Sequence, residues 1–147
     1  SVFFRRLLAL TFYTSLVLFR TLLNRKLWLN PLSDVCGGWS LWTINANGVR
    51  VLTTDSVENV LMLLPFTMLL MWAAKDKILK KVTFAGIVKS SFKTAFLFSL
   101  SIELLQLFLR VGTFQLSDLC YNILGGIIGG VIYGAVWKIK SRKKMES

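Results

Sequence analysis

The sequence predicts an all-α membrane protein, a bundle of four transmembrane helices with both termini in the cytoplasm. Three observations support this prediction: the composition, the length of the apolar segments and the placement of the basic residues. The 147 residues are 54% hydrophobic and have a mean hydropathy of +0.61, which is typical neither of a disordered chain nor of an ordinary soluble domain. We therefore treat residues 1–147 as a single transmembrane domain.

Four apolar segments have the length of ~20 residues that a helix needs to cross a bilayer. They cover residues 7–23, 57–74, 92–109 and 119–137. The first contains Arg20, whose side chain must extend to the interface. A cleaved signal peptide is the alternative interpretation of a basic start followed by an apolar segment, but no small-residue cleavage site follows it. The second segment contains Pro65, which removes a backbone donor and predicts a kink.

Basic residues are concentrated on one side of this arrangement, and short cytoplasmic loops are typically rich in lysine and arginine. Of the 18 basic residues, 13 lie before the first segment, between the second and third, at the second residue of the third, or after the fourth. We therefore predict a multi-pass protein of the bacterial inner membrane with cytoplasmic N and C termini. The net charge of +11 attracts anionic lipids to that leaflet. No nucleic-acid-binding motif is present, so membrane lipids rather than nucleic acids are the expected partners.

The main segment outside the membrane is a loop over residues 24–56. Its three tryptophans suit a belt at the membrane interface; they are Trp28, Trp39 and Trp42. Periodicity leaves open whether residues 39–44 form a short strand or an interfacial helix. Cys36 and Cys120 both lie near the outer face, so a disulfide is one interpretation and two independent cysteines are the other.

Two similar polar sequences, DSVEN at residues 55–59 and DLCYN at residues 118–122, begin the second and fourth segments. Each places an aspartate and an asparagine four residues apart, on one face of a helix. The match suggests a weak parallel repeat of two helical hairpins. Repeats in membrane proteins often place their site at the junction of the two halves.

Simpler interpretations of the same residues stay open. Asp55 with Glu58 fits a helix capping box, and Ser117 or Asp118 fits a helix N-cap. The two asparagines could also serve only as hydrogen-bond partners between helices.

The third segment carries a polar face within its apolar sequence. The residues of this face are Ser99, Glu103, Gln106 and Arg110. Glu103 lies ~9 Å below the outer end, at 1.5 Å rise per residue. A lone carboxylate at that depth costs a few kcal/mol, roughly. We therefore expect Glu103 to face the bundle and to be protonated or paired with Arg110, Asn59 or Asn122.

Glycines follow the fourth segment at spacings of four, which lets a neighbouring backbone approach closely. They form two rows, Gly126, Gly130 and Gly134 in one and Gly125 and Gly129 in the other. Close packing of this kind serves either the interior of one chain or a homodimer.

Three ordered motifs make the chain resemble the VanZ-like membrane proteins over nearly its whole length. They are ENVLMLLPF at residues 58–66, IELLQ at residues 102–106 and GTFQLSDLCYNILGG at residues 112–126. Two positions depart from the family pattern. Thr67 stands where a glycine is usual, and Gln115 stands where an acidic residue is common, which weakens a cation-binding role for the outer loop.

The resemblance implies a small bacterial membrane protein that lowers sensitivity to lipoglycopeptides, teicoplanin more than vancomycin. From the residues, our first hypothesis is a polar pocket at the outer leaflet that binds an amphiphile, either the antibiotic's acylated end or a lipid-linked envelope precursor. The candidate ligand-binding residues are Glu58, Asn59, Glu103, Gln106, Arg110, Asp118 and Asn122.

Two other functions are compatible with the sequence. A membrane enzyme could act on a lipid-linked envelope substrate with Glu103 as general acid or base, although the chain has no histidine and no nucleophile motif. Carboxylates near one face could then hold Mg²⁺ and a phosphate. A small transporter would need oligomerisation. No cofactor-binding or metal-ligand motif can be assembled, so we expect neither a cofactor nor a resident metal.

Overall fold

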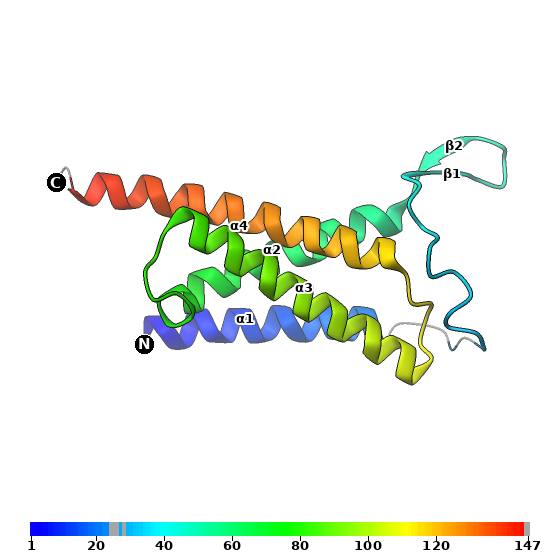
Figure 1. The fold of residues 1–147 in the computed structure, drawn as a ribbon, viewed down its shortest axis with the longest axis horizontal. Coiled ribbons are helices and arrows are strands. Elements are labelled where there is room, and N and C mark those ends of the chain that lie inside the picture. The colour runs from blue at the N-terminus through cyan, green and yellow to red at the C-terminus, as the bar shows by residue number, and fades with distance from the viewer. Residues whose placement is uncertain (24–26, 28, 146–147) are drawn as a thin grey trace.

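The computed structural model describes residues 1–23, 27 and 29–145, and this part of the chain contains four long helices and a β-hairpin (Figure 1). The helices are α1 (Val2–Leu18), α2 (Thr54–Ile78), α3 (Phe84–Leu109) and α4 (Leu116–Met145), with a π-helical turn η1 (Phe19–Leu23) continuing α1; the strands are β1 (Trp42–Ile44) and β2 (Arg50–Leu52). All four helical segments are long and apolar enough to cross a membrane. The predicted fold class is confirmed.

The helices α2, α3 and α4 extend beyond the apolar segments predicted from the sequence. α3 begins at Phe84, eight residues before the predicted segment, because the hydroxyl of Thr83 accepts the Gly86 N–H at 3.0 Å and caps the helix. α4 continues through the basic residues that follow Trp137. Hydropathy detects only the part of a helix that contacts lipid, so it misses these polar extensions.

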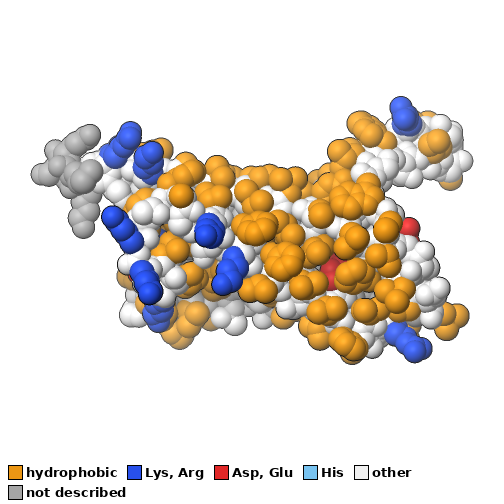
Figure 2. All heavy atoms as spheres, in the orientation of Figure 1, with side chains coloured by type: hydrophobic (Ala, Val, Ile, Leu, Met, Phe, Trp, Pro, Cys, Tyr) orange, Lys and Arg blue, Asp and Glu red, His pale blue; other side chains and the backbone are white. Residues whose placement is uncertain are grey.

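Neighbouring helices along the chain run in opposite directions (Figure 1). Both termini and the α2–α3 connection lie at one end of the bundle, and the hairpin and the α3–α4 connection lie at the other. Hydrophobic side chains cover much of the middle of the face in Figure 2, and most lysines and arginines on that face gather toward the end with the termini. The cytoplasmic location of this end stays a prediction from the charge distribution.

The long loop contains a two-stranded antiparallel hairpin, in which Thr43 pairs with Val51. This answers the open question about residues 39–44, which form a strand from Trp42 rather than a helix. Trp28 lies outside the described residues. Cys36 and Cys120 are both free and exposed, so the disulfide interpretation is wrong.

Capping is not the role of the acids at the starts of α2 and α4. The N-cap of α2 is Thr53, so Asp55 already lies inside the helix and the predicted capping box is wrong. α4 begins at Leu116, which places Ser117 and Asp118 in its first turn rather than at its N-cap. A carboxylate in a first turn is still favoured by the helix dipole.

Two rows of glycines let α4 lie directly against α2 and α3. A Cβ at Gly125 would collide with the Val60 carbonyl of α2, and a Cβ at Gly126 would collide with the Ala95 side chain of α3. The hydroxyl of Thr67 donates to the Gly126 carbonyl at 2.9 Å across the α2–α4 contact. Thr67, which departs from the family pattern, thus bonds α2 to the glycine row.

The hydrophobic core lies at mid-height between α2 and α3. Leu63 and Ala95 are fully buried, and the rings of Phe66 and Phe98 stack with centroids 4.4 Å apart. α1 packs along α2, where the Tyr13 hydroxyl donates to the Met62 carbonyl at 2.9 Å. Close contacts among α1, α2 and α3 thus hold the bundle together at mid-height.

Candidate functional site

A cavity of about 410 Å³ opens at the end of the bundle that carries the hairpin and the α3–α4 connection. Its walls come from η1, the long loop, α2, the α3–α4 connection and the start of α4. The lining residues are Arg20, Ser33, Asp34, Asp55, Glu58, Asn59, Gly112, Thr113, Gln115 and Asp118. A polar cavity of this size at the end of a membrane bundle is a candidate binding site.

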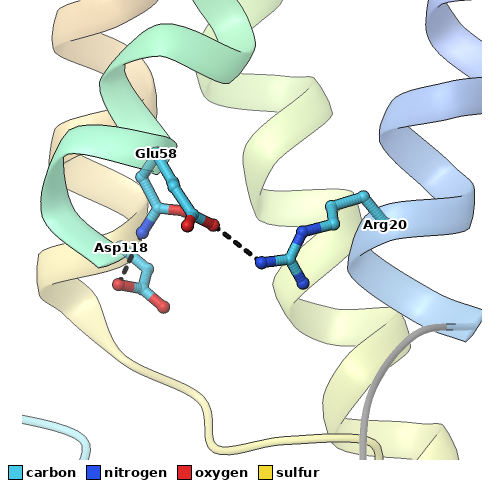
Figure 3. A network of polar contacts seen from close by, with 4 residues as sticks. Arg20, Glu58 and Asp118 are labelled. Atoms are coloured by element: carbon cyan, nitrogen blue, oxygen red, sulfur yellow. Dashed lines mark hydrogen bonds and ion pairs between the residues drawn. The ribbon is translucent and has the colours of Figure 1, made fainter. Parts of the chain in front are cut away.

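Acidic side chains dominate the charge of this cavity. Four carboxylates line it, from Asp34, Asp55, Glu58 and Asp118, against the single guanidinium of Arg20. Arg20 and Glu58 form an ion pair with an N···O distance of 2.8 Å, and both side chains are 53% exposed. In Figure 3, Arg20 of η1 and Glu58 of α2 point toward one another, and Asp118 of α4 lies beside Glu58. The remaining negative charge favours a ligand group that is cationic or donates hydrogen bonds.

The two polar sequences singled out in the chain meet at this cavity. The amide of Asn59 on α2 donates to the carboxylate of Asp118 on α4 at 2.7 Å. Asp55 lies in the same lining. Asn122, the counterpart of Asn59 in the proposed repeat, is instead 2% exposed and donates to the Ser99 hydroxyl at 3.0 Å. The first pair therefore lies at the cavity, whereas the second is divided, with Asp118 in the lining and Asn122 in the core.

Glu103 lies behind the cavity wall rather than among the lining residues. Its side chain is 2% exposed, and its carboxylate accepts the backbone N–H of Gln115 at 3.3 Å. The Gln115 side chain in turn donates to the Asp34 carboxylate at 2.6 Å. Glu103 thereby holds the α3–α4 connection, which carries the lining residue Gln115. Through Gln115 it also holds the long loop, which carries the lining residue Asp34.

Two of the side chains considered as partners of Glu103 form hydrogen bonds with other residues. Asn59 and Asn122 bond to Asp118 and Ser99, respectively. Arg110 is exposed at the C-cap of α3, in a left-handed conformation with φ 54°, and forms no ion pair within the described part of the chain. Helical spacing predicted that Arg110 lies on the same face as Glu103. Because Arg110 lies one residue beyond the end of α3, its side chain is exposed instead.

Gln106 positions the segment that carries Arg20. It is 3% exposed, and its amide donates to the Thr21 carbonyl of η1 at 2.8 Å. A π-helical turn changes the hydrogen-bonding register of a helix, and such turns are frequent at functional sites. Gln106 satisfies a carbonyl within this irregular turn, so the polar face of α3 supports the cavity from below.

Sequence reasoning missed several lining residues. In the sequence Arg20 stands out only as a charge at the end of an apolar segment, although a charge in such a position is itself a signal for an ion pair. Asp34 lies in an irregular loop, where no periodicity indicates which direction a side chain takes. Gln115 was noted as a departure from a family pattern, and its side chain links Asp34 to the α3–α4 connection.

A comparison with protein families identifies the chain. The family model described as VanZ/LLP1 matches residues 3–138, nearly the whole length. No curated protein matches the chain, and no solved structure matches it. The resemblance inferred from the three motifs is confirmed.

Proposed function

The chain belongs to the VanZ/LLP1 family, and we propose that it lowers the sensitivity of a bacterial cell to lipoglycopeptide antibiotics such as teicoplanin. It acts as a binding module of the inner membrane, with the acidic cavity at the outer leaflet. The polar head of an amphiphile enters the cavity, and its acyl chain lies against the neighbouring helices. The observation that carries this proposal is the cavity of about 410 Å³ with four carboxylates in its lining.

The charge of the cavity supports one kind of head group over another. Carboxylates attract amines and accept hydrogen bonds from hydroxyl and amide groups, whereas they repel phosphate. Of the two ligands considered from the sequence, an acylated antibiotic with amine or hydroxyl donors suits the lining better than a phosphorylated lipid precursor. Asp55 is exposed at the cavity and free to accept such donors, since no bond occupies it within the described chain.

Apolar side chains beside the cavity suit the acyl chain of the ligand. Phe19, next to Arg20 in η1, is 59% exposed, and Leu61, three residues after Glu58 in α2, is 57% exposed. Both belong to segments that are long and apolar enough to cross a membrane, so we expect the surface they present to contact lipid. An amphiphile in the outer leaflet could thus place its head in the cavity without leaving the bilayer.

The same geometry supports binding more than catalysis. Glu103, the residue that an enzyme of this fold would use as acid or base, lies behind the wall and accepts a backbone N–H. A general acid or base must come within hydrogen-bond reach of the reacting group. The supporting position of Glu103 therefore favours a binding module.

Substitution of a lining carboxylate tests the proposal. Asp55→Asn removes one charge from the cavity without breaking a bond in the described structure, and Asp76→Asn removes one charge at the opposite end of α2. We expect Asp55→Asn to weaken teicoplanin binding by purified protein about 10- to 100-fold, from the loss of a charged hydrogen bond worth ~1.5–3 kcal/mol. Teicoplanin resistance should fall in parallel, at unchanged membrane abundance, while Asp76→Asn behaves as the parent. Equal binding by both variants would refute the cavity as the site.

A further inference from the structure

A second cavity, of about 240 Å³, lies at the opposite end of the bundle, where the termini gather. It is formed by the start of α1 and the ends of α2 and α4. The lining includes Arg6, Trp72, Lys75, Tyr133, Trp137 and Lys140. This combination of basic and aromatic side chains is typical of the membrane interface, where aromatic rings lie at the level of the lipid head groups.

The charge of the second cavity is opposite to that of the first. Three basic side chains line it, and no acidic residue of the described chain does. Lys75 is 14% exposed and pairs with Asp76 at 2.7 Å, but the Asp76 side chain is 72% exposed and is not part of the lining. Arg6 and Lys140 have no acidic partner among the described residues. The cavity therefore retains positive charge.

Arg6 is held in place by two contacts with Trp72. Its Nη1 donates to the Trp72 carbonyl at 3.3 Å, and its Cζ lies 5.2 Å from the centroid of the Trp72 ring. Its Nε–H is buried and has no partner within the described chain. A fixed guanidinium with a free N–H is suited to a phosphate, which arginine binds through parallel hydrogen bonds.

We infer that this cavity binds the phosphate head group of an anionic phospholipid in the leaflet at the end of the bundle with the termini. The phosphate accepts hydrogen bonds from Arg6 and Lys140. The glycerol backbone lies against the aromatic rings of Trp72 and Trp137, and the acyl chains follow the apolar sides of α2 and α4. The chain thus carries two sites of opposite charge, an acidic one for the amphiphile and a basic one for a resident lipid.

Lipid binding by purified protein in detergent tests this inference. Phosphatidylglycerol, phosphatidylcholine with the same acyl chains, and inorganic phosphate are each titrated, and the bound fraction is measured by native mass spectrometry. The parent protein should retain phosphatidylglycerol in preference to the other two. Arg6→Gln with Lys140→Gln should weaken phosphatidylglycerol binding about 30-fold, the effect expected of two basic residues near a lipid surface.

A matched variant distinguishes lipid binding at the cavity from attraction of the lipid to basic residues elsewhere on the surface. Lys138→Gln with Arg142→Gln removes the same number of positive charges, from the residues on either side of Lys140 in α4, but both residues lie outside this cavity. This control should keep the parent's preference, and Lys140→Glu alone should reduce it without touching the Arg6 contacts. Equal losses in the two double variants, or equal binding of phosphatidylcholine, would overturn the inference. Binding of inorganic phosphate as tight as that of phosphatidylglycerol would show a free-phosphate site and would also overturn it.

Discussion

The amide of Asn59 donates a hydrogen bond of 2.7 Å to the carboxylate of Asp118, joining α2 to α4 at the floor of the acidic cavity. The two residues are 59 positions apart in the chain. Asn59 is buried, whereas Asp118 is partly exposed to the cavity. The bond therefore aims a carboxylate toward the cavity while it holds two spanning helices together.

Removal of this bond should destabilise the bundle. We expect Asn59→Ala to lower the free energy of unfolding by ~1–3 kcal/mol, because a charged acceptor loses this one donor. Thermal unfolding in detergent measures the change. In a double-mutant cycle, Asp118→Ala should cost less in the Asn59→Ala background than in the parent. Additive effects of the two substitutions would contradict a direct coupling.

A side chain at Gly125 should separate α4 from α2. Its Cβ would meet the backbone carbonyl of Val60, which cannot move without shifting the neighbouring Asn59. We expect Gly125→Val to destabilise the protein by ~1–3 kcal/mol, the usual cost of overpacking. Ala135→Val on the exposed side of α4 adds similar volume and serves as the control. Equal unfolding temperatures for the two variants would argue against close α2–α4 contact.

The ion pair between Arg20 and Glu58 should contribute to binding more than to stability. Both side chains are 53% exposed, and exposed pairs typically add less than ~1 kcal/mol. Arg20→Gln should thus change the unfolding temperature little but tighten the binding of a cationic ligand, because the cavity becomes more acidic. Calorimetric titration measures the affinity. A large loss of stability would show that Arg20 has a structural role.

Substitutions of Glu103 distinguish two roles of this residue: support of the wall of the acidic cavity, and general acid or base in an enzyme. Glu103→Gln keeps an oxygen that can accept the Gln115 N–H, whereas Glu103→Leu removes it. If Glu103 supports the wall, resistance should persist in Glu103→Gln and fall in Glu103→Leu. Resistance assays at matched membrane abundance measure both. Complete loss in a stably folded Glu103→Gln variant would instead favour the enzyme hypothesis.

The predicted orientation can be tested with the free cysteines. Cys36 is exposed in the long loop, so a membrane-impermeant maleimide should label it in intact cells when Cys120 is replaced by serine. A variant that lacks both cysteines and carries Lys80→Cys, in the α2–α3 connection, should be labelled only after the membrane is opened. The reverse pattern would invert the orientation, and with it the assignment of the acidic cavity to the outer leaflet.

The four spanning segments, the family and the polar ends of α2 and α4 follow from the sequence alone, because length, hydropathy and ordered motifs are local properties. The sequence also indicates that Ser99, Glu103 and Gln106 are on one face, since helical spacing decides that, and all three are buried in the structure. Which of these polar groups reach a cavity depends on how the helices and loops pack in the folded protein.

The reason is that the depth of a side chain and the direction in which it points depend on the neighbouring helices and loops. Glu103 was the residue of greatest interest in the sequence, yet a turn of chain at Gln115 covers it. Asp34 had no pattern to mark it, yet the folded loop brings it into the lining. Spacing along a helix fixes the face of a side chain, but the packing of loops and helices against that face decides whether the side chain contacts a ligand or supports a residue that does.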